Sequence, residues 1–123
     1  MHYASKAYAT VAKEIADPRE LEASLLLKAA AKLQAAHDSW RDAAPNLGEA
    51  VMYNRRLWTV FIDAVMSDEN KLPIPVRQNI ANIGIFVMGE IFSLMTAPKP
   101  DHLTSIIKVN RRIAAGLRRK AEQ

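Results

Sequence analysis

Six prolines divide this chain into long stretches that contain none, and their positions constrain its fold more than any other feature. Proline disrupts a helix interior but is well tolerated in the first helical turn, so it marks where helices begin and end. The prolines are Pro18, Pro45, Pro73, Pro75, Pro98 and Pro100. Between them, apolar residues recur at spacings of three and four, which is the period of one helical face. This pattern predicts four long helices joined by short turns.

Two of the long helices are expected in the first half of the chain. The first begins at Asp17 and Pro18, where Asp17 can cap free backbone N–H groups and Pro18 suits the first helical position. Its apolar face consists of Leu26, Ala29, Leu33, Ala36, Trp40 and Ala43. The second follows Asn46, an expected cap. Its apolar face consists of Ala50, Tyr53, Leu57, Val60, Phe61, Ala64 and Val65. A shorter and weaker helix is expected over residues 4–15.

The other two long helices are expected in the second half. The helix over residues 75–95 is apolar almost all round, which predicts a central position with neighbours on most sides. Gly84 and Gly89 within it each cost about 1 kcal/mol relative to alanine, and this cost predicts close approach of a neighbouring backbone. The last helix covers residues 102–119. Its apolar face consists of Leu103, Ile106, Ile107, Asn110, Ile113, Ala114 and Leu117.

Composition agrees with a helical fold. Half of the residues are hydrophobic but only 7% are aromatic, and the chain has four glycines. Alanine and leucine favour helices, and scarce glycine leaves few places for tight hairpin turns. We therefore expect an all-α protein, a compact antiparallel bundle of four long helices plus a short N-terminal helix. With 123 residues, the chain is expected to form a single domain over residues 1–123.

The residue inventory argues against catalysis and bound cofactors. The absence of cysteine excludes disulfides, thiolate metal sites and a cysteine nucleophile. The histidines lack the spacing that places two imidazoles on one helical face: they are His2, His37 and His102. No glycine-rich phosphate loop and no serine nucleophile elbow is present. We expect no enzyme, no catalytic residue, no cofactor and no metal site.

Two groups of residues that contain acids could also have a chemical role, one as a metal site and one in acid–base catalysis. His37, Asp38 and Asp42 could meet a metal ion, but a solvated helix face is the commoner meaning of such a cluster. Glu90 is the one acid in the most apolar helix, where a buried carboxylate could act as a general acid or base. An isolated acid of this kind more often pairs with an arginine or faces a gap in the packing.

The chain is expected to be cytoplasmic and not to associate with a membrane. Its first residues have no charged segment followed by an apolar segment, so they do not resemble a signal peptide. Asn82, Glu90 and Ser93 interrupt the most apolar stretch, over residues 80–94. That stretch falls short of the roughly 18 uncharged residues of a spanning helix.

Charge is unevenly distributed along the chain. Residues 1–70 hold eight Lys or Arg against ten Asp or Glu, whereas residues 71–123 hold nine against three, so the two parts carry −2 and +6. The basic residues of 108–120 could contact phosphates, because a basic helical stripe is typical of nucleic-acid binding. Cations also favour a helix C-terminus and keep its outer face solvated. The solvated interpretation is favoured, since no aromatic residues alternate with the basic ones to stack on bases.

A contact surface for a protein partner is expected around Arg55, Arg56 and Trp58. Tryptophan and arginine are enriched among residues that dominate interface energies, although core packing is the commoner role of a tryptophan such as Trp58. Asn110 lies in phase with the apolar face of the last helix. It is either a buried asparagine that bonds neighbouring backbone and fixes helix register, or an anchor for a partner.

Four segments carry a family resemblance. They are Asn54-Arg55-Arg56-Leu57-Trp58, Leu72-Pro73, Arg77-Gln78-Asn79-Ile80-Ala81-Asn82-Ile83-Gly84 and Asn110-Arg111-Arg112-Ile113-Ala114-Ala115-Gly116-Leu117. In order and spacing they resemble FlaF, the flagellar biosynthesis regulators of alphaproteobacteria. The part from Tyr8 through residues 18–23 is similar to the family as well. The resemblance covers essentially the whole chain.

The resemblance implies a small cytoplasmic helical protein that is needed for flagellin production and export. It would bind flagellin, act alongside the regulator FlbT, and have no enzymatic activity. The family supplies no settled functional residues, so the candidates for partner binding are the motif positions Asn54, Arg55, Arg56, Trp58, Asn110, Arg111 and Arg112. We expect a groove beside Trp58 to hold one helical end of flagellin. The alternatives are a regulator that binds flagellin mRNA through residues 108–120, and an adaptor that joins FlbT or a second copy.

Overall fold

The computed structural model describes residues 18–122, with side chains described through residue 119. These residues form four long helices and one short 3₁₀ helix, and no strand occurs among them. In chain order they are α2 (Pro18–Asp38), η1 (Trp40–Asp42), α3 (Leu47–Met66), α4 (Ile74–Thr96) and α5 (Pro100–Glu122). The predicted all-α bundle of four long helices is therefore confirmed. The short helix expected over residues 4–15, and the cap at Asp17, lie outside the described residues.

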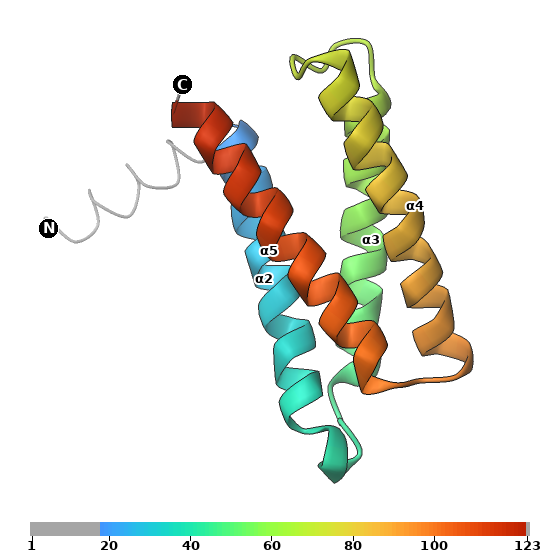
Figure 1. Ribbon diagram of the computed structural model, residues 1–123. Helices are drawn as coiled ribbons and strands as arrows, with labels where there is room; N and C mark the ends of the chain where they lie inside the picture. Colours follow the sequence, from blue (N-terminus) through green and yellow to red (C-terminus); the bar gives the residue numbers. More distant parts are fainter. Residues whose placement is uncertain (1–17, 123) are drawn as a thin grey trace, which may run out of the picture.

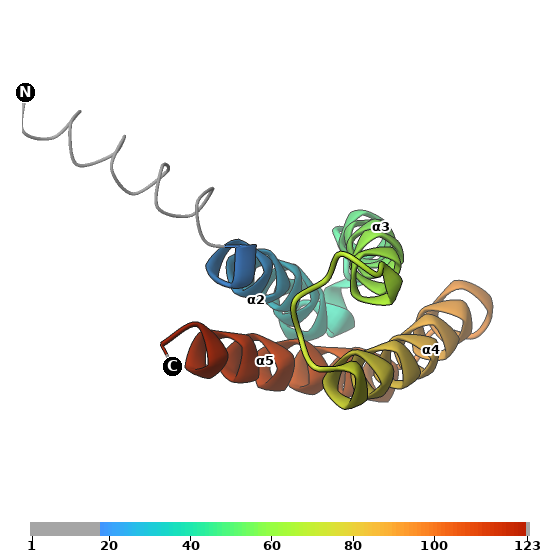
Figure 2. The same ribbon diagram turned by 90° about the horizontal axis from the view of Figure 1, so that it is seen from above.

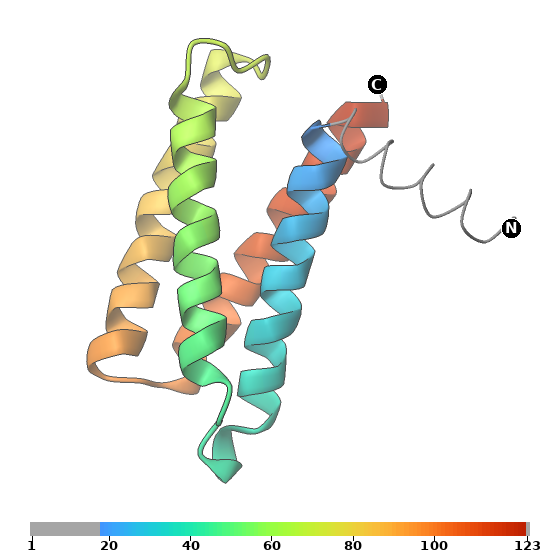
Figure 3. The ribbon, with the colours of Figure 1, turned by 180° about the vertical axis from the view of Figure 1, so that it is seen from behind.

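The helices form an antiparallel ring (Figure 1). Each helix packs against the next in the chain, and α2 closes the ring by packing along α5, which is the most extensive of the four pairs. Seen from above, α5 and α4 follow one curved layer, and α2 and α3 lie together on one side of it (Figure 2). The view from behind shows α3 between α2 and α4 (Figure 3). Leucine, isoleucine and alanine from all four helices fill the space that the ring encloses.

The first long helix ends earlier than the apolar periodicity predicts. The expected face extends to Trp40 and Ala43, but α2 stops at Asp38. The Ser39 hydroxyl donates to the Ala35 carbonyl at 2.9 Å, and such a side-chain bond competes with continued helix. Ala43 and Ala44 then have φ values of 68° and 40°. This left-handed backbone reverses the chain toward α3.

The buried face of α3 is rotated from the expected one. It consists of Ala50, Val51, Asn54, Trp58, Phe61 and Val65. Tyr53 and Leu57 are half-buried, and 67% of Val60 is exposed. A polar residue in the core is what misplaced the face, because apolar periodicity counts Asn54 as outside. Asn46 does stand at the N-cap position, but its side chain makes no capping hydrogen bond.

The fourth helix, α4, lies at the edge of the bundle, so its expected central position is wrong. It packs against α3 and α5 with Ile80, Val87 and Ile91 buried, while 70% of Ile85 and 67% of Phe92 remain exposed. In a ring of four helices each member has two close neighbours, so an all-round apolar helix keeps one apolar face outside. By length and composition alone α4 could cross a membrane, contrary to the expectation. Core helices of soluble proteins pass the same test.

The two glycines of α4 differ in their surroundings. A Cβ atom on Gly84 would lie 2.6 Å from Cγ1 and Cδ1 of Ile62 and 3.4 Å from Cε3 of Trp58. The close approach predicted at Gly84 therefore exists, made by side chains of α3 and not by a backbone. A Cβ on Gly89 would meet nothing within 4 Å, so the same prediction is wrong there.

Alanine at these two positions is expected to change stability in opposite directions. Gly89→Ala should raise the free energy of unfolding by about 0.5–1 kcal/mol, because alanine favours helix and nothing obstructs its methyl group. Gly84→Ala should lower it by about 1 kcal/mol, because Ile62 must move and overpacking outweighs the gain in propensity. Urea denaturation of both variants measures the difference. Equal stabilisation by both changes would contradict the close approach of α3 at Gly84.

Candidate partner-binding surface

Three of the expected contact residues form a hydrogen-bonded network in the interior instead. Asn54, Trp58 and Asn110 are all 0% exposed. The Trp58 indole Nε1 donates to Oδ1 of Asn110 at 2.8 Å, and Nδ2 of Asn110 donates to Oδ1 of Asn54 at 2.8 Å. Nδ2 of Asn54 donates to the carbonyls of Ala29 and Ala50 at 3.1 and 2.9 Å. The network joins α2, α3 and α5.

Both ends of this network fix the orientation of its amides. The indole N–H of Trp58 can only donate, so it requires the oxygen of Asn110 on its side. The carbonyls of Ala29 and Ala50 can only accept, so they require the nitrogen of Asn54. The Asn110 nitrogen is then left facing the Asn54 oxygen, which is the pairing observed. Satisfied polar groups of this kind specify one arrangement of the helices around them.

The expected contact surface at Trp58 is therefore misplaced. The Trp58 ring is fully buried and packs edge-on against Phe61, with centroids 5.5 Å apart. No groove for a flagellin end can lie against a ring with no exposed atoms, and Asn54 and Asn110 are equally inaccessible. Of the two interpretations of Asn110, the structure supports the buried asparagine. Its side chain bonds the side chains of Trp58 and Asn54, and not neighbouring backbone.

The four arginines among the candidates do lie on the surface. Arg55 and Arg56 are exposed on α3, and Arg111 and Arg112 are exposed on α5. Because Trp58 is 0% exposed, neither pair forms a surface site with it. Arg111 and Arg112 border hollows in the surface, whereas Arg55 and Arg56 line none of those described below.

A groove runs between α4 and α5. It consists of two hollows of about 240 and 340 Å³ that share Ile83, Arg112 and Ile113. We call it the α4–α5 groove. Its lining comprises Leu72, Val76, Asn79, Ile80, Asn82, Ile83, Phe86, Val109, Arg112, Ile113, Gly116 and Leu117. Most of these side chains are aliphatic, so the groove offers apolar contact along its length.

Helical spacing explains why these residues line one groove. On α4 the positions 76, 79, 80, 83 and 86 recur every three or four residues, and on α5 the positions 109, 112, 113 and 116 do the same. Gly116 carries no side chain, and a Cβ there would meet nothing within 4 Å. The floor of the groove is therefore left open at that point.

Further apolar side chains of α4 are exposed outside the groove. Phe86 lines the groove and is 50% exposed, and further along α4 the side chains of Phe92 and Met95 are 67% and 54% exposed. Arg77 and Glu90 are the only charged residues of this helix. Exposed apolar side chains gathered on one element mark interaction surfaces more often than those scattered singly.

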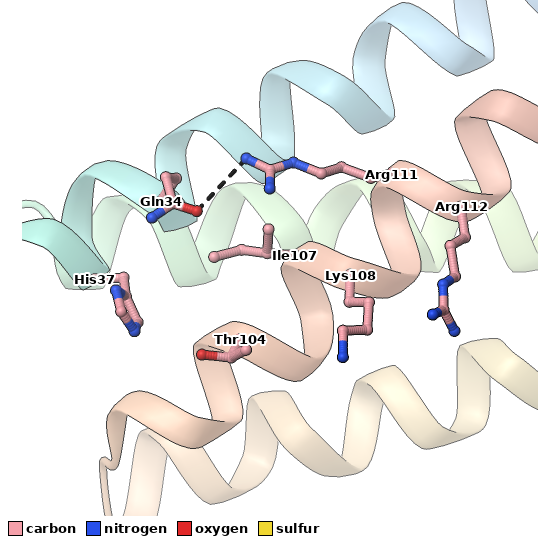
Figure 4. Close-up of a pocket in the computed structure, with 7 residues that line it drawn as sticks. All are labelled: Gln34, His37, Thr104, Ile107, Lys108, Arg111 and Arg112. Carbon is pink, nitrogen blue, oxygen red and sulfur yellow. Dashed lines mark hydrogen bonds between the residues drawn. The ribbon is translucent and has the colours of Figure 1, made fainter.

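A third hollow, of about 370 Å³, lies between α2 and α5. We call it the basic pocket. It is lined by Gln34, His37, Thr104, Ile107, Lys108, Arg111 and Arg112 (Figure 4). Nη2 of Arg111 donates to Oε1 of Gln34 at 3.5 Å, across the two helices. Lys108 and Arg112 project from the same side of α5, toward α4 (Figure 4).

The cations of the basic pocket have no acidic partner in the part of the chain that the structure describes. Over that part, the ion pairs between α2 and other helices are Lys32 with Glu49 and Arg118 with Glu20. Neither involves Lys108, Arg111 or Arg112. Asp38, at the end of α2, accepts from Nε2 of Gln34 at 2.8 Å. The pocket therefore carries an excess of positive charge.

The structure places both of the acidic features that the sequence singles out, Glu90 and the His37–Asp38 stretch. Glu90 pairs with His102, whose Nδ1 lies 2.8 Å from Oε2 of Glu90, and not with an arginine. His37 and Asp38 approach within 3.8 Å, but over residues 18–119 no three His, Asp or Glu side chains gather closely enough to hold a metal ion.

Sequence reasoning missed the α4–α5 groove and the basic pocket as sites. The signals were present in part: α4 is apolar on more faces than two neighbours can cover, and α5 carries its cations beside its apolar face. The neighbours of α5 depend on the order of the four helices around the ring. No local sequence pattern encodes that order.

Comparison with known proteins identifies the family. Residues 4–117 match the model of the family described as flagellar protein FlaF. The comparison with curated proteins and the comparison with solved structures each found no match. The family match spans nearly all of the chain and contains all four helices up to residue 117. The chain therefore belongs to the FlaF family of flagellar proteins.

Proposed function

We propose that this protein binds flagellin in the cytoplasm and thereby supports flagellin synthesis and export during flagellum assembly, with FlbT as a further partner and without enzymatic activity. One observation carries the proposal: a member of a flagellar family exposes an apolar groove, between α4 and α5, on an otherwise well-packed bundle. A surface of this kind is costly to leave open to water. Its presence is explained if a partner covers it.

The groove suits a helical segment of flagellin. As a class, flagellin subunits have helical ends that pack only in the filament, so before export their apolar stripes need cover. A groove between two helices can receive such a stripe at positions i, i+3, i+4 and i+7. From residue 76 to residue 86 the α4 side extends about 15 Å at 1.5 Å per residue, which is close to three helical turns.

A change in the groove is expected to weaken flagellin binding. Phe86→Ser should reduce the affinity for purified flagellin about tenfold, because half of this ring is open to a partner and its burial would contribute about 1.5 kcal/mol. Isothermal titration calorimetry measures the affinity. Val60→Ser on α3 is the matched control, since Val60 is an exposed apolar residue outside the groove, and it should bind as the wild type does.

Two results would contradict the proposal. If the folded wild-type protein does not bind flagellin, flagellin is not its partner. If Phe86→Ser and Val60→Ser bind equally well, flagellin is held elsewhere than in the α4–α5 groove.

The alternative, a regulator that binds nucleic acid through residues 108–120, is less favoured. Arg118 is bonded to Glu20 of α2 through both Nε and Nη2, at 2.9 to 3.2 Å. That pair removes one cation from the stripe that would face phosphates. Of the other cations in the stripe, Lys108, Arg111 and Arg112 line the basic pocket, and Arg112 also borders the largely aliphatic α4–α5 groove.

A further inference from the structure

We infer that the basic pocket binds carboxylate side chains that lie along one edge of the partner helix in the α4–α5 groove. The partner segment would thus be an amphipathic helix with an apolar stripe and, beside it, acidic residues spaced one turn apart. The inference rests on the proposed function, because it takes flagellin as the protein that supplies this helix.

The groove and the pocket form one continuous surface. Arg112 lines both hollows of the groove and the basic pocket as well. Lys108 stands four residues before it on α5, which places the two cations on the same side of the helix and about 6 Å apart along its axis. Carboxylates at i and i+4 of a helix lying along α5 have the same separation. A partner that fills the groove would bring its edge over these two cations.

The charge of the pocket calls for an anionic group. Lys108, Arg111 and Arg112 have no carboxylate partner among the described residues, and Arg111 bonds only the neutral Gln34 across the hollow. The planar guanidinium of Arg112 can bind a carboxylate through two parallel hydrogen bonds. A bound helix would also exclude water from one side of the pocket, which strengthens each pair relative to a fully solvated one.

The neighbouring surface favours a protein over a nucleic acid. Beside the cations lie Ile83, Val109 and Ile113, which are aliphatic. Phe86 is the one aromatic side chain among the described residues that line the groove, whereas single-stranded nucleic acids are bound where several aromatic side chains stack on successive bases. An apolar stripe flanked by acids complements both parts of this surface.

Calorimetric titration with purified flagellin tests the inference. The variant is Lys108→Gln/Arg112→Gln, and the control is Arg41→Gln/Lys99→Gln, which removes the same charge from exposed positions outside the groove and the pocket. At about 0.05 M salt we expect the variant to bind about tenfold more weakly than the wild type and the control to bind within about twofold of it. At about 0.5 M salt the difference should shrink, because exposed charges are then screened within a few ångströms.

Each other outcome overturns a defined part of the argument. If both double variants weaken binding equally, only the net charge matters and the pocket is not a site. If Phe86→Ser weakens binding but Lys108→Gln/Arg112→Gln does not, the groove holds a helix without an acidic edge. If the wild type does not bind flagellin, the proposed function fails first. If a polyuridine RNA binds as tightly as flagellin and loses its affinity in the same variant, the pocket is a nucleic-acid site.

Discussion

Replacing Trp58 with alanine is expected to lower the free energy of unfolding by about 3–5 kcal/mol, the largest effect of any single aromatic truncation in this chain. The ring is 0% exposed and packs against Phe61 and beside Gly84. Its removal leaves a cavity in a well-packed core and also leaves Oδ1 of Asn110 without the indole donor. Denaturation in urea, followed by circular dichroism, measures the loss.

The second tryptophan provides the control. Trp40 is half-buried in the 3₁₀ helix and borders a hollow at the surface. Trp40→Ala should therefore cost about 1–2 kcal/mol, in proportion to the smaller apolar area that it covers. Equal losses in the two variants would contradict the position of Trp58 at the centre of the core.

The size of this effect decides how binding experiments are designed. Small domains are stable by about 5–15 kcal/mol, so Trp58→Ala removes a large part of the total. Lost flagellin binding in that variant would report unfolding and not a lost contact. Exposed residues such as Phe86, whose truncation leaves the core intact, are the informative positions for binding.

Much of the architecture could be predicted from the sequence. Proline positions mark the turns before α3, α4 and α5, and the start of α4 at Ile74 and its end at Thr96 lie within one residue of the predicted bounds. Every residue on the predicted face of the last helix is buried or half-buried in the structure. These features are local: a proline acts on its own turn, and periodicity of three and four needs only one amphipathic helix.

The sequence-based predictions are wrong where a residue distant in the chain changes which side of a helix is buried. Asn54 is polar, so its periodic position was assigned to the outside, yet a partner fifty-six residues away satisfies its oxygen in the core. The buried face of α3 therefore includes Asn54 and Trp58, in addition to the expected Ala50, Phe61 and Val65. Likewise α4 is apolar enough to be central, but the ring order leaves it two close neighbours.

The candidate site could be predicted only in part for the same reason. The cations of α5 are visible in the sequence, and so is the apolar character of α4. The α4–α5 groove and the basic pocket arise only when α5 lies between α4 and α2 (Figure 2). Lys108 and Gln34, both in the basic pocket, are far apart in the chain, and no spacing rule relates them.

Replacing Asn110 with aspartate is expected to lower the free energy of unfolding by about 3–5 kcal/mol at pH 7, the second large effect. The position is 0% exposed, and its nitrogen is the donor to Oδ1 of Asn54. An ionised carboxylate there would still accept from Trp58, but it would place a negative charge against the Asn54 oxygen. A protonated carboxyl group, by contrast, can donate to Asn54 and accept from Trp58 at once.

The cost of Asn110→Asp should therefore depend on pH. Burial and the hydrogen bond to Asn54 favour the neutral acid, so the pKa of the new carboxyl group in the folded state is raised above the unfolded value of about 3.9. Below about pH 4 the group is neutral in both states, and the variant is at its most stable relative to the wild type. As pH rises toward the raised pKa, the unfolded chain loses its proton first, and relative stability falls by up to about 1.4 kcal/mol per pH unit.

The variant Asn110→Ala measures the stability that is lost with the amide alone, without a group that titrates. Alanine leaves the indole N–H of Trp58 and the Oδ1 of Asn54 without partners, which should cost about 2–4 kcal/mol, but it introduces no group that titrates. The difference in stability between the aspartate and alanine variants should thus widen against the aspartate from pH 4 to pH 8. A constant difference would contradict both the burial of position 110 and its donation to Asn54. The pH series therefore tests the middle link of the network, the bond that joins Asn110 of α5 to Asn54 of α3.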